Sequence, residues 1–120
     1  MRILLVDPDF QSQQNLINVI KELEPSLLIE VARSAYDAST RLRFGRYDII
    51  ICEIFLPDLR GDLMMGFLKS EAFKIGITGY LTSPEIRRSF DDVLLKPVSE
   101  DELKLSIVNA RMKSPMIGYC

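Results

Sequence analysis

The stretch IICEIFLPDLRG, residues 50–61, decides how this chain folds. It opens on apolar residues without polar alternation, which is typical of a strand buried on both faces of a sheet. Glu53 ends this run, and a loop that contains Pro57 and Gly61 follows it. The sequence therefore places a carboxylate where a buried strand meets solvent, and Glu53 is the first candidate for a functional side chain.

Short apolar runs alternate with helical patterns along the chain. Five runs indicate strands, at residues 3–6, 27–31, 49–52, 75–78 and 93–95. Helical patterns follow them at about 11–24, 35–44, 62–72, 84–90 and from 99 onward. A capping box of Ser99 and Glu102 marks the start of the last helix. This order predicts an α/β fold with one doubly wound, five-stranded parallel (βα)5 sheet, because right-handed crossovers place helices on both faces.

Length and composition fit one soluble domain. The chain has 120 residues, 48% hydrophobic and 27% charged, which is enough for one core and too little for two. We assign residues 1–113 to the domain and 114–120 to a C-terminal tail. The sequence shows no signal peptide and no membrane span, and Cys52 and Cys120 suggest neither a disulfide framework nor a zinc site. A cytoplasmic location is expected.

Charge and histidine content exclude several functions. The formal charge is −2, so the chain lacks the basic footprint that direct binding of nucleic acid requires. It has no histidine, which removes imidazole metal ligation and His-dependent catalysis. We therefore expect no enzyme, and no direct partner in nucleic acid or membrane.

Polar side chains stand at four of the predicted strand ends. They are Asp7 and Asp9 after the first strand, Glu53 at the end of the third, Thr78 at the end of the fourth and Lys96 after the fifth. In doubly wound sheets the ligand site lies outside the carboxyl ends of the strands, so these groups should gather at one edge. Such a cluster could hold a divalent cation or a phosphoryl group.

These motifs, in this order, resemble those of response-regulator receiver domains, the phosphorylatable switches of bacterial two-component signalling. The resemblance covers about residues 2–113 and implies the flavodoxin-like receiver fold. It rests on ILLVDPD at 3–9, IICEIFLPDLRG at 50–61, IT at 77–78 and LLKP at 94–97.

The resemblance implies roles for individual residues. In that family an acidic pair after the first strand holds Mg²⁺, and an Asp at the end of the third strand accepts a phosphoryl group from a kinase His. A hydroxyl and a Lys contact that group. Asp7 then matches the first acid, Thr78 the hydroxyl and Lys96 the Lys. Pro57 and Gly61 match loop residues that follow the acceptor, and the Lys-Pro bond after the fifth strand should be cis.

Two positions depart from the family pattern. Glu53 occupies the acceptor position, and Pro8, which has no side-chain oxygen, occupies the position of the second acid. Asp9 comes one residue later, where its side chain should point elsewhere. This leaves at most a weak Mg²⁺ site at Asp7 and Glu53. The chain is therefore interpreted as an atypical receiver, or pseudo-receiver, without a cofactor and without phosphorylation at the usual site.

The longer side chain of Glu53 suggests a contact across the pocket. It should pair with Lys96 and accept a hydrogen bond from Thr78. Two interpretations remain open: Glu53 weakly imitates a phosphorylated acceptor, or the pair is only scaffold. Replacing Glu53 by Gln should destabilise the fold under both, whereas only mimicry predicts weaker partner binding.

This chain also lacks one part of the switch that ordinary receivers use. Receivers commonly carry a Tyr or Phe three residues before the Lys, and this ring turns inward when the Thr moves. Val93 stands at that position, so the resemblance implies that Thr–aromatic coupling does not operate here.

The last helix presents a candidate partner face. Leu105, Val108 and Met112 fall opposite the stripe that should face the sheet, so they should be exposed. In the receiver family the surface of the fourth helix, fifth strand and fifth helix commonly binds partners or a second copy. We expect a protein partner or a homodimer there, with a histidine kinase or another signalling protein as candidates.

Two alternative functions stay open at this point. One is a working phosphoacceptor that uses another carboxylate, such as Asp58, with unusual metal ligation. The other is a flavodoxin-like enzyme, although the chain has neither a Gly-rich phosphate loop nor a nucleophile–base pair.

Overall fold

Five parallel strands form one sheet with the order β2-β1-β3-β4-β5 in the computed structural model, which describes residues 1–113. The strands are β1 (Arg2–Val6), β2 (Leu28–Ala32), β3 (Ile49–Glu53), β4 (Phe73–Thr78) and β5 (Asp92–Leu95). The helices are α1 (Phe10–Leu23), α2 (Ala35–Phe44), α3 (Gly61–Leu68), α4 (Pro84–Arg87) and α5 (Glu100–Lys113). The predicted (βα)5 order is confirmed. The tail at 114–120, with Cys120, lies outside the described residues, so the domain boundary at 113 stays a prediction.

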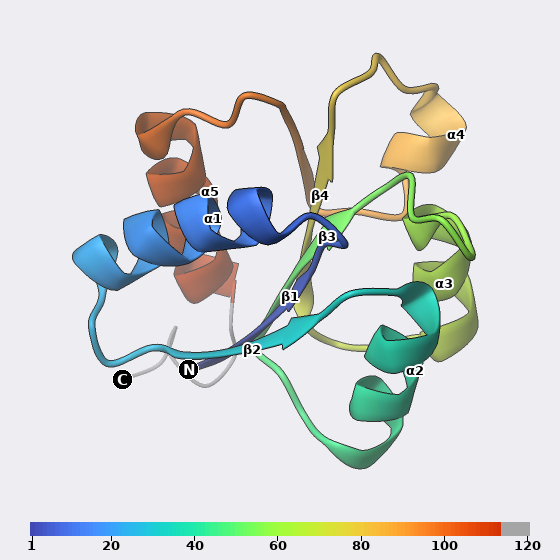
Figure 1. Cartoon of the computed structure of the whole chain (residues 1–120), viewed down its shortest axis with the longest axis horizontal. Helices are drawn as coiled ribbons and strands as arrows, with labels where there is room; N and C mark the ends of the chain where they lie inside the picture. Colours follow the sequence, from blue (N-terminus) through green and yellow to red (C-terminus); the bar gives the residue numbers. More distant parts are fainter. Residues whose placement is uncertain (114–120) are drawn as a thin grey trace.

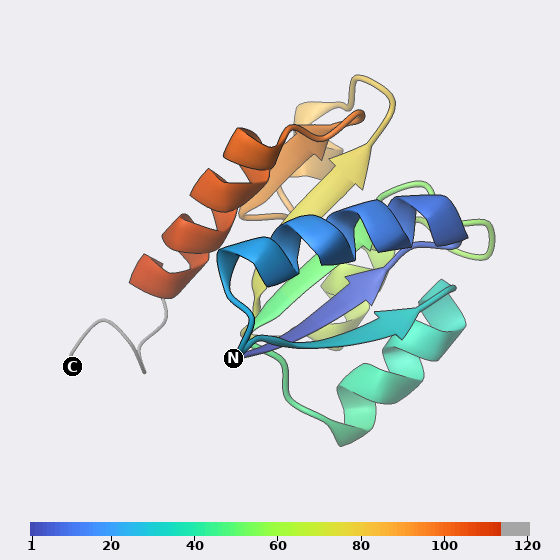
Figure 2. The same ribbon diagram turned by 60° about the vertical axis from the view of Figure 1, so that its left-hand side comes forward.

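Helices cover both faces of the sheet. Helices α1 and α5 lie on one face, and α2, α3 and α4 lie on the other (Figures 1 and 2). The central strand β3 is buried on both sides, since Ile49, Ile50 and Ile51 are fully inaccessible to solvent. Alternate side chains of the strands therefore enter two separate cores, one under each helical layer. The continuous apolar run at residues 49–52 follows from this double burial.

Helices α3 and α4 are shorter than the sequence predicts. Helix α3 ends at Leu68 because Lys69 adopts a left-handed conformation with φ 47°, a C-terminal conformation usually taken by glycine. Helix α4 is a single turn. It is opened by Ser83, whose side chain accepts from the backbone N–H of Ile86, and by Pro84 at the first positions. None of the described helices is both long and apolar enough to cross a membrane.

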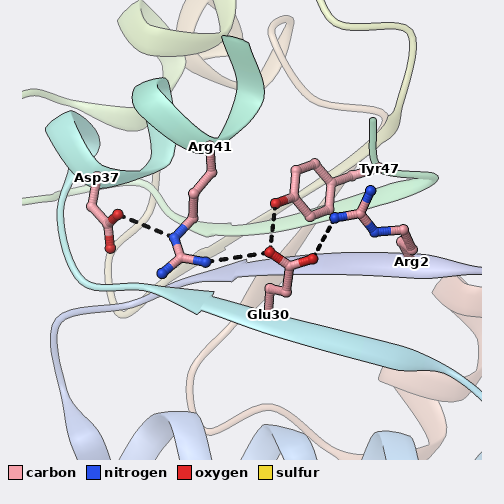
Figure 3. A network of polar contacts seen from close by, with 5 residues as sticks. All are labelled: Arg2, Glu30, Asp37, Arg41 and Tyr47. Carbon is pink, nitrogen blue, oxygen red and sulfur yellow. Dashed lines mark hydrogen bonds and ion pairs between the residues drawn. The ribbon is translucent and has the colours of Figure 1, made fainter. Parts of the chain in front are cut away.

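A polar network ties the edge strand β2 to its neighbours (Figure 3). Glu30 of β2 accepts from the guanidinium of Arg2 on β1, from the hydroxyl of Tyr47 at 2.8 Å and from Arg41 of α2 at 3.3 Å. Arg41 also donates to Asp37, one helical turn earlier, at 3.1 Å. Both oxygens of Glu30 thus have donors, and the network links β1, β2, α2 and the segment before β3.

Candidate functional site

The carboxyl ends of the strands bring three charged side chains together. Asp7 follows β1, Glu53 ends β3, and Lys96 follows β5. The Nζ of Lys96 lies 3.4 Å from Oε2 of Glu53 and 3.6 Å from Oδ2 of Asp7. Asp7 is almost fully buried, while the side chains of Glu53 and Lys96 are 16% and 29% exposed. One amine therefore stands between two carboxylates, and the expected Glu53–Lys96 pair is present. The Lys96–Pro97 bond is cis, as the resemblance implied.

Asp7 is held in place by its neighbours. Its Oδ1 accepts from the backbone N–H of Asp9 at 2.9 Å, and its backbone N–H donates to Ala32 at the end of β2. The side chain of Gln13, which is buried on α1, donates to the backbone carbonyl of Asp7 at 2.6 Å. Sequence reasoning missed Gln13. The signal is an amide three residues before Leu16, on the stripe of α1 that faces the core.

Burial governs the acidity of Glu53. Burial raises the pKa of its carboxyl, and the positive charge of Lys96 opposes this effect while the negative charge of Asp7 adds to it. The contact with Lys96 is close enough for an ion pair, yet Oε2 of Glu53 has no partner with hydrogen-bond geometry. A buried carboxylate oxygen without a full hydrogen bond costs free energy, so this position is not optimised for stability.

Thr78 does not make the predicted contact. Its side chain is fully buried at the end of β4, and its Oγ1 accepts from the backbone N–H of Tyr80 at 3.1 Å. No hydrogen bond joins Thr78 to Glu53 among the described contacts. The expectation that Glu53 accepts from Thr78 is therefore wrong, and the one contact of this hydroxyl among the described residues is with the loop that follows its own strand.

The residues present do not form a magnesium site of the kind that the fold family implies. Pro8 is exposed and offers no side-chain oxygen, and Asp9 caps α1 by accepting from the backbone N–H of Ser12 at 2.8 Å. Lys96 already places a positive charge beside the remaining acids, Asp7 and Glu53. Within residues 1–113, no group of three or more acidic, His or Cys side chains is placed to hold a metal ion. That the pocket binds no Mg²⁺ stays a prediction.

Gly61 allows the loop after β3 to close on the site. A Cβ at this position would lie 2.9 Å from Sγ of Cys52 and 3.0 Å from the backbone oxygen of Glu53. The backbone N–H of Gly61 donates to Ile54 at 2.6 Å. This close approach brings the start of α3 against the end of β3, so the loop with Pro57 fixes the backbone that carries Glu53.

Asp58 points away from the charged cluster. Its two carboxylate oxygens accept from the backbone N–H groups of Ala35 and Tyr36, each at 3.0 Å. These bonds lower the pKa of Asp58 and place its negative charge at the N-terminus of α2. The geometry gives Asp58 a capping role, which its place in the Pro57–Gly61 loop did not reveal.

The position of the family's aromatic switch is occupied by Val93, and an aromatic pair, Phe55 and Tyr80, lies in the loops after β3 and β4. Val93 on β5 is half-buried and packs against the core under α2 and α3. Phe55 lies two residues after Glu53, Tyr80 lies two residues after Thr78, and their rings meet edge to face with centroids 5.6 Å apart. This pair joins the loop after β3 to the loop after β4.

The outer face of α5 is exposed as predicted. Leu105, Val108 and Met112 are 62%, 48% and 74% exposed. The opposite stripe of Leu103, Ile107 and Ala110 is buried in the core under α1 and α5. Leu95 of β5 adds a further exposed apolar side chain.

Comparisons with known proteins identify the fold. No family model matches the sequence. The transcriptional regulatory protein CitT of Bacillus subtilis (strain 168) is 23% identical over an alignment 139 residues long, gaps included, that covers 99% of this chain. The chain spans 61% of the length of that relative.

Solved structures of response regulators resemble this chain closely in fold. A two-component response regulator from Clostridium difficile superposes with a TM-score of 0.84 at 24% identity, over 95% of this chain and 99% of that one. A CheY-like receiver domain from Methylobacillus flagellatus gives 0.83 at 19% identity, over 92% and 98% of the two chains. The chain therefore has the flavodoxin-like fold of response-regulator receiver domains, as its motifs indicated.

Proposed function

We propose that the chain acts as an atypical receiver in two-component or phosphorelay signalling, that it is not phosphorylated at the usual site, and that it works through protein–protein interaction rather than as an enzyme. The observation that carries this proposal is the position of the Lys96 amine, 3.4 Å from Glu53 and 3.6 Å from Asp7. The amine that would contact a phosphoryl group is thereby engaged by the protein's own carboxylates.

Charge supports the absence of phosphotransfer. A phosphoryl group carries a charge of about −1.5 to −2 at neutral pH, and it would enter beside the acids Asp7 and Glu53 with one amine to balance them. In ordinary receivers a metal ion offsets such charge, whereas Pro8 and Asp9 contribute no ligand here.

Both interpretations of Glu53 remain within this proposal. The single charge of Glu53 on Lys96 imitates part of a phosphorylated acceptor, or it only neutralises the amine. Partner affinity separates them, because replacing Glu53 by Gln should weaken partner binding only under mimicry.

The partner face is proposed on α4, β5 and α5. Leu95, Leu105, Val108 and Met112 supply exposed apolar side chains suited to a protein partner or a second copy of the chain. A histidine kinase or another signalling protein fits this role. A cytoplasmic location belongs to the same proposal. That the chain itself makes no direct contact with nucleic acid stays a prediction, since the relative CitT is named as a transcriptional regulator.

Acetyl phosphate and Mg²⁺ provide the test. We expect no gain of mass in the wild type, and phosphorylation in a variant with Glu53→Asp and Pro8→Asp, which restores the acceptor and the second acid. A wild type that gains one phosphoryl group would contradict the proposal. Loss of that gain in an Asp58→Asn variant would then support Asp58 as the acceptor, and a flavin or nucleotide that co-purifies with the protein would favour the enzyme alternative.

A further inference from the structure

A second exposed apolar surface lies on the opposite side of the sheet from α5. On α2, Tyr36 and Phe44 are 80% and 86% exposed, and on α3, Leu63 and Phe67 are 44% and 76% exposed. Helices α2 and α3 pack side by side on this face (Figures 1 and 2). We call these four side chains the α2–α3 surface. Three of its members are aromatic, the residue class that most often anchors protein interfaces.

The spacing of these residues puts them on the outer faces of the two helices. Tyr36 and Phe44 are eight residues apart, so they lie on one side of α2, while Ala35 and Ala38 face the core. On α3, Leu63 and Phe67 are four residues apart, while Met64 and Met65 are buried. The exposed stripe of α3 carries no charged residue.

Gly66 leaves the exposed stripe of α3 without a side chain at one position. A Cβ at Gly66 would meet nothing within 4 Å, so the backbone there is open to solvent. A side chain of a partner can therefore approach the backbone of α3 closely at Gly66.

The charged residues around this surface are mainly basic. Arg33, Arg43, Arg46 and Lys69 are exposed and take part in none of the ion pairs among residues 1–113. Two nearby acids, Glu71 and Asp91, are also exposed and without an ion pair, and they line one pocket with Arg46. The chain as a whole has a formal charge of −2, so this local excess of positive charge is opposite in sign to the net charge.

The acids of the same region are already engaged. Asp37 accepts from Arg41 at 3.1 Å, and Asp62 forms a two-point contact with Arg60 at 2.6 and 3.0 Å. Asp58 caps α2. The four basic side chains therefore outnumber the exposed acids that have no cation as a partner, and this local excess favours an acidic partner.

We propose that the α2–α3 surface binds an acidic amphipathic helix of another protein. The apolar side of such a helix would contact the exposed rings along α2 and α3, and its Asp or Glu residues would lie against Arg43 and Lys69. Two copies of this chain joined face to face through a two-fold axis would instead bring these basic residues together, which disfavours a homodimer at this face. The surface is separate from the α4–β5–α5 face, so this site does not depend on the function proposed above.

The test uses two helical peptides that share one apolar face, with Glu at the flanking positions in one and Lys in the other. Each is titrated into ¹⁵N-labelled protein. We expect the acidic peptide to shift the amide signals of α2 and α3, with affinity in the range of roughly 10 to 100 μM, and the basic peptide to bind at least about tenfold more weakly. Added salt should weaken the acidic complex.

Matched variants locate the site. Phe67→Ser and Arg43→Glu should each weaken binding of the acidic peptide by about tenfold. Leu105→Ser and Lys104→Glu on α5 are the controls and should leave binding unchanged, because α5 lies on the opposite face of the sheet. All four side chains are exposed, so the controls match the test variants in burial. Urea midpoints close to that of the wild type show that each variant keeps its fold.

Three outcomes would overturn the proposal. The first is equal binding of both peptides, or no binding of either at millimolar concentration. The second is loss of binding in the α5 controls while Phe67→Ser binds normally. The third is concentration-dependent self-association of the free protein that Phe67→Ser abolishes, since it would make a second copy the occupant.

Discussion

Two carboxylates at different places in the sheet have opposite surroundings. Glu30 on the edge strand β2 accepts at both oxygens, from Arg2, Tyr47 and Arg41, and these bonds lower its pKa (Figure 3). Glu53 at the end of β3 is more deeply buried, its Oε2 has no hydrogen-bond partner, and burial raises its pKa.

This difference gives a criterion for telling a structural ion pair from a candidate functional site. When hydrogen bonds to a carboxylate contribute more free energy than the loss of hydration costs, the charged form is stabilised. Glu30 is such a case. A carboxylate that is desolvated beside another acid, as Glu53 is beside Asp7, is held in a less favourable state by the surrounding fold. The three charges at the strand ends have therefore not been optimised for stability alone.

Removing the central cation should have the largest effect. Lys96→Met leaves Asp7 and Glu53 next to each other without a positive charge, so we expect the free energy of unfolding to fall by roughly 3 kcal/mol. Arg41→Met in the network of Glu30 should cost only about 0.5 to 1 kcal/mol, because that group is more exposed and Glu30 keeps other donors. Urea unfolding at neutral pH measures both changes.

A double variant provides the control for this prediction. Glu53→Gln together with Lys96→Met should be more stable than Lys96→Met alone, since one of the two uncompensated acids is removed. Equal losses in Lys96→Met and Arg41→Met would erase the contrast between the two regions.

The network of Glu30 should stabilise the protein only while Glu30 is ionised. We expect Glu30→Gln to lower the free energy of unfolding by about 1 kcal/mol at neutral pH, a value reduced for solvent screening. Because the folded pKa lies below the ordinary 4.5, this contribution is complete above 4.5 and is lost as the pH falls through the folded pKa. Urea midpoints of variant and wild type should therefore converge in acid, and a gap that stays constant with pH would refute the assignment.

Glu53 should show the opposite sign and the smallest effect. Its folded pKa lies above the ordinary 4.5, so ionisation of Glu53 lowers stability as the pH rises from 4.5 through the folded pKa. Glu53→Gln leaves the neutral pair of Asp7 and Lys96, and it should match or exceed the wild type by up to about 1 kcal/mol at neutral pH. The expectation from sequence, that Glu53→Gln destabilises the fold, predicts the opposite sign. A clear loss of stability at neutral pH would support that expectation.

The sequence predicts the fold well because a parallel sheet leaves strong local signals. Apolar runs predicted all five strands, with ends that differ by at most two residues from those observed, and Ser99 marked the start of the last helix. The end of α3 could not be predicted, because Lys69 adopts a left-handed backbone conformation that residues other than glycine rarely take.

The charged members of the site were predictable for a topological reason. The carboxyl ends of β1, β3 and β5 lie at one edge of the sheet, which brings the side chains of Asp7, Glu53 and Lys96 within reach of one another. Hydrogen-bond choices were not predictable. Thr78 binds a backbone N–H of its own loop and Asp58 caps a distant helix, since each satisfies a nearby buried or terminal backbone group first.

A titration of the side-chain carboxyl carbons by ¹³C NMR tests the central claim most directly. The account predicts a midpoint above 4.5 for Glu53 and below 4.5 for Glu30 in the same sample, with the midpoint of Glu53 rising further in Lys96→Met. A midpoint for Glu53 at or below that of Glu30 would contradict it, because the pocket would then be an ordinary, well-solvated ion pair.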